Sequence, residues 1–165
     1  RSSDLRIMED PRDLNTRAEI QWIASIAHNN LLDTGRIGDW GSHRIEHELS
    51  AQYGITHGEG MAVVTLAWLR YAAEHKPSKP AQLAERVFAV DSRSYDDREK
   101  TLKVAEYLEH FFKKLELRTT LTELGIGTEY FSEMALRATK NDKTEVGHYI
   151  PLNAELFIEI LKLAV

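Results

Sequence analysis

The sequence predicts an all-α domain, a bundle of about seven helices, from three observations. Apolar residues recur at helical spacing along most of the 165 residues. Glycines, prolines and capping residues divide these periodic segments into lengths that are typical of helices. No run of alternating apolar residues lies between turn signals, so nothing in the pattern favours a sheet.

The first predicted helix covers residues 13–32 and follows a polar segment that contains Pro11. Its apolar residues recur at helical spacing, and Asp13 precedes them where a capping residue is expected. The sequence DTGRIG, residues 33–38, ends this helix in a loop.

The next two helices are predicted over residues 40–53 and 58–74 and flank a short connection. Asp39 is suited to cap the first of them, and Gly54 is expected to end it in the left-handed conformation. The second contains the segment MAVVTLAWL, which is apolar on nearly every side. We therefore expect it to be the buried centre of the domain.

The remaining elements alternate with polar connections. Their predicted extents are residues 81–89 after Pro80, 96–117, one short turn at 120–124, 128–139 with Thr128 as cap, and 154–163 with Asn153 as cap.

Composition excludes several classes of protein. With 42% apolar and 28% charged residues the chain is an ordinary globular sequence, expected to form one domain. A net charge of −5 provides no basic surface, so we expect no nucleic-acid partner. The uncharged runs at 20–32 and 60–69 are too short to span a bilayer and no signal peptide is evident, so we expect no membrane contact. The absence of cysteine suits a cytoplasmic protein.

The strongest functional pattern is a cluster of histidines. His43, His47 and His57 lie within fifteen residues of one another. Positions four apart share a helix face, and the break at Gly54 lets the chain turn and present His57 toward the same space. There is no cysteine, so a metal would be bound by imidazole, carboxylate or backbone oxygen. The pattern favours a metal site.

Two further hypotheses remain open at this point. Residues 43–47 match H-x-x-E-H, in which two histidines bind zinc and the glutamate activates water in a hydrolase. Glu46, however, lies about 100° round the helix from His47, and both Glu46 and Glu48 are equally well interpreted as solvated charges. The other hypothesis is a non-catalytic helical module.

A longer pattern supports a different function. The stretch DWGSHRIEHELSAQYGITHG, residues 39–58, resembles the motif of the iron-containing (group III) alcohol dehydrogenases, in the branch of butanol dehydrogenases and NADPH-dependent aldehyde reductases. The segments DPRDLNTRAEIQWIASIAHNNLL, TTLTELGI and IPLNAELFIEILKLA are similar to neighbouring parts of that family. The resemblance covers essentially the whole chain.

The resemblance implies a fold and a set of site residues. The chain is similar to the C-terminal helical domain of the dehydroquinate synthase-like fold, which in the family follows an N-terminal α/β domain that binds the nicotinamide. The family holds its metal with one aspartate and three histidines, of which His43 and His57 match this sequence. His47 corresponds to a pocket residue beside the metal that could relay a proton. Trp40 is either pocket wall or a core residue.

The resemblance also implies the chemistry. A divalent ion, Fe(II) or Zn(II), polarises an aldehyde while NADPH or NADH donates hydride, or the reverse reaction oxidises a primary alcohol. The other two ligands and the cofactor motifs have no counterpart here, so the expected partner is an N-terminal domain of the same polypeptide. The chain begins with Arg1, as a fragment would. We predict that alone it binds metal weakly and is inactive; a homodimer is a possible assembly.

Overall fold

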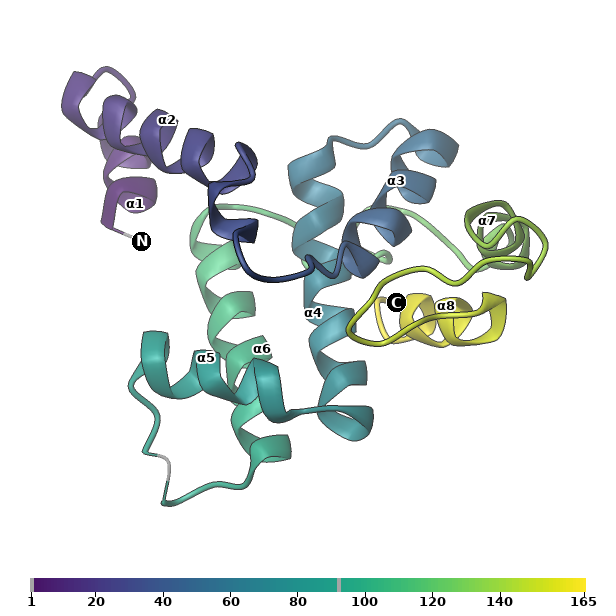
Figure 1. Cartoon of the computed structure of the whole chain (residues 1–165). Helices are drawn as coiled ribbons and strands as arrows, with labels where there is room; N and C mark the ends of the chain where they lie inside the picture. The colour runs from purple at the N-terminus through teal and green to yellow at the C-terminus, as the bar shows by residue number, and fades with distance from the viewer. Residues whose placement is uncertain (1, 92) are drawn as a thin grey trace. The chain divides into compact units, whose positions relative to one another are not determined.

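The regular structure of the chain is helical, as predicted. The computed structural model describes residues 2–91 and 93–165. Among them the one β-type pairing is an isolated bridge between Val146 and Leu152. Eight α-helices and one 3-10 helix span these residues: α1 (Ser2–Glu9), α2 (Leu14–His28), η1 (Leu31–Asp33), α3 (Gly41–Tyr53), α4 (His57–His75), α5 (Ser78–Phe88), α6 (Asp97–Lys114), α7 (Phe131–Ala138) and α8 (Ala154–Lys162) (Figure 1).

The chain forms two compact units, Arg1–Gly38 and Asp39–Val165. The first holds α1, α2 and η1, and the second holds the five helices from α3 to α7 together with α8. None of the described helices is both long and apolar enough to cross a membrane.

In the first unit, α2 is shorter than predicted. Asp13 caps it as expected, and its side chain accepts hydrogen bonds from two backbone N–H groups of the first turn. The helix ends at His28 because Asn30 adopts a left-handed conformation, with φ 64°, which asparagine tolerates better than most residues. The Asn29 side chain accepts the N–H of Leu31, 3.0 Å away, and starts η1.

Helix α1 was not expected, because the segment is short and mostly polar and Pro11 follows it. It packs against α2, where Ser3 donates a hydrogen bond to Glu19. The apolar residues of α2 that predicted the helix stay largely exposed, among them Trp22 and Ile23.

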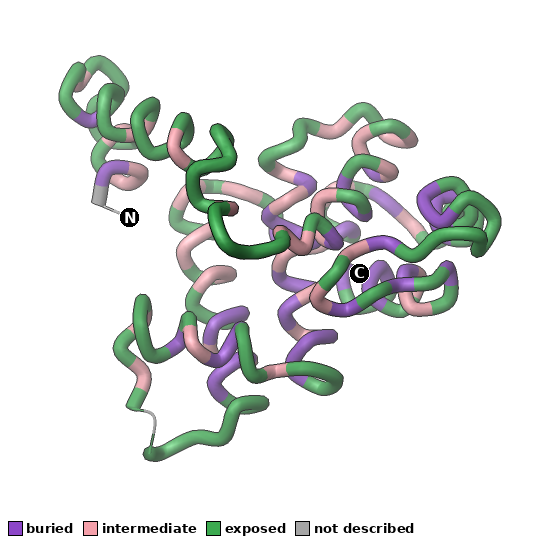
Figure 2. The backbone as a smooth tube through the Cα atoms, viewed as in Figure 1, coloured by how far each residue is buried: buried purple, intermediate pink, exposed green. Residues whose placement is uncertain are grey.

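Helix α4 is the buried centre of the second unit, as its composition predicts. Ten of its residues are buried, and it contacts α3, α5, α6 and α8. Figure 1 shows α4 between α6 and α8, and Figure 2 shows the buried positions continuing along it. The main core also includes residues of α3, α7 and α8, such as Leu49, Met134 and Phe157, all fully buried.

Capping was predicted correctly at some helices and wrongly at others. Asn153 caps α8, and Asp96 caps α6 within a capping box completed by Glu99. Thr128 does not cap α7, which begins three residues later at Phe131 without a side-chain cap. Asp39 is not the cap of α3: Trp40 takes that position in a left-handed conformation, with φ 58°. The Asp39 carboxylate instead binds a loop that lies far away in the sequence.

Candidate metal centre

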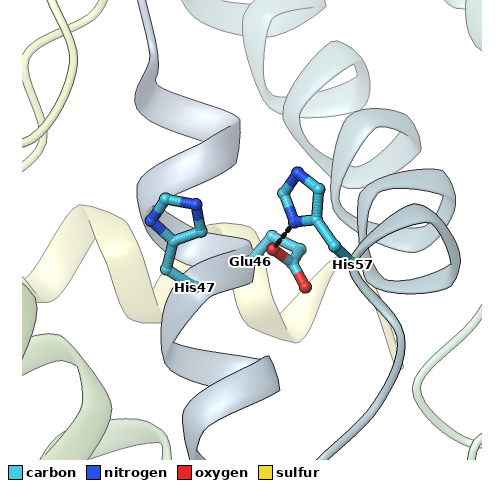
Figure 3. A group of neighbouring side chains, drawn as sticks. All are labelled: Glu46, His47 and His57. Atoms are coloured by element: carbon cyan, nitrogen blue, oxygen red, sulfur yellow. Dashed lines mark hydrogen bonds and ion pairs between the residues drawn. The ribbon is translucent and has the colours of Figure 1, made fainter.

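The turn between α3 and α4 builds the site. Gly54 ends α3 with φ 67°, and its N–H donates to the carbonyl of Ser50 over 2.9 Å, as predicted for a left-handed helix end. Only Gly54, Ile55 and Thr56 separate the two helices, so the first residue of α4, His57, faces the side of α3. Figure 3 shows His57 and His47 projecting from neighbouring helices beside Glu46.

The three predicted histidines lie together. The ring centres of His43 and His57 are 5.4 Å apart, those of His47 and His57 are 5.5 Å apart, and those of His43 and His47 are 6.4 Å apart. His57 is therefore the member common to both of the closer pairs. His43 is half-buried, and His47 and His57 are exposed.

These distances can be compared with what one bound ion requires. Two imidazoles that bind a tetrahedral ion through nitrogens about 2.1 Å from it have ring centres roughly 5 Å apart. The His43–His57 and His47–His57 pairs are close to that separation, whereas the His43–His47 pair is wider. The residues present thus fit a divalent ion that has His57 as one of its ligands. The assignment of His43 as the second ligand stays a prediction.

Glu46 is not a solvated charge, contrary to the sequence interpretation. Its side chain is fully buried, and its carboxylate contacts the Nδ1 atom of His57 and accepts a hydrogen bond from Ser50 Oγ. One potential ligand atom from each of Glu46, His47 and His57 lies within 4.8 Å of the other two. In the part of the chain that the structure describes, this is the one group of three such side chains.

The burial of Glu46 also bears on the hydrolase hypothesis. A general base must reach a water molecule, and a carboxylate that has no exposed surface, accepts from Ser50 and contacts His57 has no route to one. The H-x-x-E-H pattern therefore lacks its base. Glu48 is partly buried and pairs with Arg137 over 2.9 Å, so it does not replace Glu46.

Trp40 lies at the rim of the site. It is 46% exposed, and its ring forms a T-shaped contact with that of His43, with ring centres 4.9 Å apart. A core role for this tryptophan, one of the two alternatives, is wrong at that exposure. Its left-handed backbone turns the chain between Asp39 and α3.

Three other histidines of the second unit are exposed. His75 is exposed and stacks on Tyr71, with ring centres 4.1 Å apart, and His110 is exposed on α6. The side chain of His148 is exposed in a loop whose backbone N–H groups bind Asp39.

Sequence reasoning missed the residues that support the cluster. Ser50 lies four positions after Glu46, a spacing that places the two side chains on one helix face. Gly60 is one of two glycines in the first turn of α4, and the side chain of Glu46 occupies the space beside it. The spacing of Ser50 from Glu46 is visible in the sequence, whereas nothing in the sequence distinguishes Gly60 from Gly58.

Comparison with known proteins assigns the family. The model of the Fe-containing alcohol dehydrogenase family, C-terminal, matches residues 3–165. The chain belongs to this family and corresponds to its C-terminal region, as the resemblance of residues 39–58 predicted.

Individual relatives of the chain are named for their activities. The chain is 35% identical over 156 residues to NADH-dependent butanol dehydrogenase A of Clostridium acetobutylicum, an alignment that covers 94% of this chain and 40% of the relative. It is 28% identical over 142 residues to the NADPH-dependent aldehyde reductase YqhD of Escherichia coli, covering 86% and 36% of the two chains. The chain thus spans about 40% of the length of the first of these relatives.

Solved structures agree with the fold. The crystal structure of NADH-dependent butanol dehydrogenase A from Thermotoga maritima superposes with a TM-score of 0.85 at 34% identity, covering 96% of this chain and 41% of that one. Escherichia coli YqhD superposes with a TM-score of 0.90 over 99% of this chain and 42% of that one; at 24% identity this similarity concerns the fold alone.

Proposed function

We propose that this chain is the metal-binding helical part of an NAD(P)-dependent alcohol dehydrogenase that interconverts an aldehyde and a primary alcohol by hydride transfer. The observation that carries the proposal is the convergence of His43, His47 and His57 from two adjacent helices, in a chain of the Fe-containing alcohol dehydrogenase family. Relatives named as NADH-dependent butanol dehydrogenase and NADPH-dependent aldehyde reductase support the substrate class.

His43 and His57 hold the ion in this proposal. Their ring separation of 5.4 Å suits one divalent cation, and imidazole is a ligand for both Fe(II) and Zn(II). When bound, the ion supplies a Lewis acid that polarises the carbonyl group, and the nicotinamide supplies or accepts the hydride.

In this proposal His47 transfers the proton of the alcohol oxygen. It is exposed and its ring lies 5.5 Å from that of His57, beside the ion but outside the pair that holds it. Imidazole exchanges protons near neutral pH, so His47 can deliver a proton to the oxygen that becomes the alcohol, or remove it in the reverse direction. Trp40 forms part of the apolar wall of the substrate pocket.

The remaining parts come from elsewhere in the polypeptide. In the proposal the other two ligands, an aspartate and a histidine, and the nicotinamide site belong to an N-terminal α/β domain of the same polypeptide, which is cytoplasmic. The 165-residue chain alone then binds metal weakly and does not reduce aldehydes.

The experiment uses protein purified from its source without chelator, its intact mass measured beside that of the 165-residue chain. The source protein is expected to be longer and to reduce butanal with NADH or NADPH; chelator removes this activity and Fe(II) or Zn(II) restores it. Replacing both His43 and His57 by alanine should abolish activity and metal content, while His110→Ala should retain both.

Two results would contradict the proposal. One is aldehyde reduction by the His43 and His57 double variant at the rate of the unmodified protein. The other is a stoichiometric, tightly held ion in the isolated chain, since the proposal leaves that chain with half of its ligands.

A further inference from the structure

We propose that Glu46 is a positioning residue for the metal ligand His57: its buried carboxylate accepts the Nδ1–H of His57 and leaves the opposite ring nitrogen, Nε2, to bind the ion. The inference rests on the proposed function and adds to it a residue that touches neither ion nor substrate. It also explains why a glutamate is buried at a site that otherwise consists of exposed or half-buried histidines.

The two side chains in contact, those of Glu46 and His57, differ in exposure to solvent. The Glu46 side chain has no exposed surface, whereas that of His57 is 48% exposed. Burying a carboxylate is costly unless hydrogen bonds compensate, and here Nδ1 of His57 and Oγ of Ser50 both face its oxygens. In Figure 3 the Nδ1 atom is turned to Glu46, and the other nitrogen lies on the opposite side of the ring.

Two neighbours hold the carboxylate in place. Ser50, one turn further along α3, donates its hydroxyl to Oε1. Gly60, on α4, leaves the space that the side chain occupies: a Cβ atom there would lie 2.6 Å from Oε1 and 2.8 Å from Cγ of Glu46. The carboxylate is thus enclosed between α3 and α4 and cannot turn away from His57 without disturbing one of them.

This arrangement determines which nitrogen binds metal. A neutral imidazole carries one hydrogen, and a carboxylate that accepts it at Nδ1 leaves the lone pair on Nε2. Histidines that bind metals commonly donate their other N–H to a carboxylate, which fixes the tautomer and the ring orientation. Loss of such a partner typically weakens metal binding about 10- to 100-fold.

The first test measures the tautomer in the metal-free chain. Nitrogen-15 NMR of the histidine side chains, recorded at a pH where each ring carries one hydrogen, should show that hydrogen on Nδ1 of His57. A wild-type His57 that carries its hydrogen mainly on Nε2 overturns the inference, whatever the variants do.

The second test is a Zn²⁺ titration of the 165-residue chain and its variants. Glu46→Met keeps the length of the side chain and removes the acceptor, so the Kd for Zn²⁺ should rise about tenfold or more. Glu46→Gln keeps a neutral acceptor and should fall between Glu46→Met and wild type. Glu48→Met and Glu48→Gln are the matched controls on the same helix and should bind like wild type.

The outcomes separate the inference from the proposed function. Equal Zn²⁺ affinity in wild type, Glu46→Gln and Glu46→Met overturns the positioning role and leaves the metal site intact. Zn²⁺ binding that is unchanged in His43→Ala and His57→Ala, together with the Nδ1–H tautomer, contradicts the metal site and leaves the hydrogen bond. Circular dichroism checks that each variant is folded; if Glu46→Met unfolds the chain, the Glu46→Gln variant and the wild-type tautomer decide.

Discussion

The carboxylate of Asp39 accepts a hydrogen bond from the backbone N–H of Tyr149, 2.7 Å away, although 110 positions separate the two residues. The same oxygen accepts the N–H of His148 at 2.8 Å, and the other oxygen accepts that of Gly41 at 3.3 Å. One side chain therefore fastens the loop before α8 to the start of α3, the helix that carries His43 and His47.

Removing this carboxylate should destabilise the second unit. Asp39→Ala leaves backbone donors without their acceptor, so we expect the free energy of unfolding to fall by about 2 kcal/mol. Asp39→Asn keeps an acceptor oxygen and should lose less. Urea denaturation measures both. Glu106→Ala, at an exposed position on α6, is the control and should change stability by less than about 0.5 kcal/mol; an equal loss in the control and in Asp39→Ala would contradict the role of Asp39.

Replacing each of two glycines of α4 by alanine should change the stability of the chain in opposite directions. Gly60→Ala places a Cβ against the enclosed Glu46 side chain, and we expect a loss of about 1–3 kcal/mol from overpacking. Gly58→Ala meets nothing within 4 Å and should gain up to about 1 kcal/mol from helix propensity. Thermal unfolding of the two variants gives the comparison. Stabilisation by both would mean that Glu46 is not held in place.

The stability of the chain should depend on pH through Glu123. Its carboxylate accepts the backbone N–H of Thr119 at 2.7 Å, and this bond, with a weaker one from Thr120, holds the pKa of Glu123 below its usual value of 4.5. A lowered pKa adds stability that is complete above about pH 4.5 and is lost as the pH falls through the folded-state value. The difference in unfolding free energy between wild type and Glu123→Gln should therefore shrink from pH 6 toward pH 3, about the range in which this carboxyl titrates. A difference that stays constant over that range would contradict the assignment.

Much of the fold follows from local pattern. The all-round apolar segment of α4 predicts burial because no face of such a helix can be left to solvent, and it is buried. Gly54 predicts the helix end because it takes a positive φ without cost, and it has one. Helix α1 was not predicted because the segment is short and mostly polar; it packs on α2.

The candidate site was predicted in part. The four-residue spacing of His43 and His47 and the break at Gly54 were enough to bring the three histidines together. The burial of Glu46 could not follow from α3 alone, because the groups that enclose it include His57 and Gly60 of another helix. Helical periodicity describes which face a residue is on, but not what a second helix places there.

The most direct test of the central claim is the Kd for Zn²⁺ of three single variants, His43→Ala, His47→Ala and His57→Ala, each compared with the unmodified chain. Ring separations of 5.4 and 5.5 Å make His43 and His47 equally suitable companions for His57, so affinity must distinguish them. Loss of a metal ligand should weaken binding at least about tenfold. We predict that loss for His43→Ala and His57→Ala and little change for His47→Ala. Strong loss in His47→Ala with unchanged binding in His43→Ala would contradict the ligand assignment.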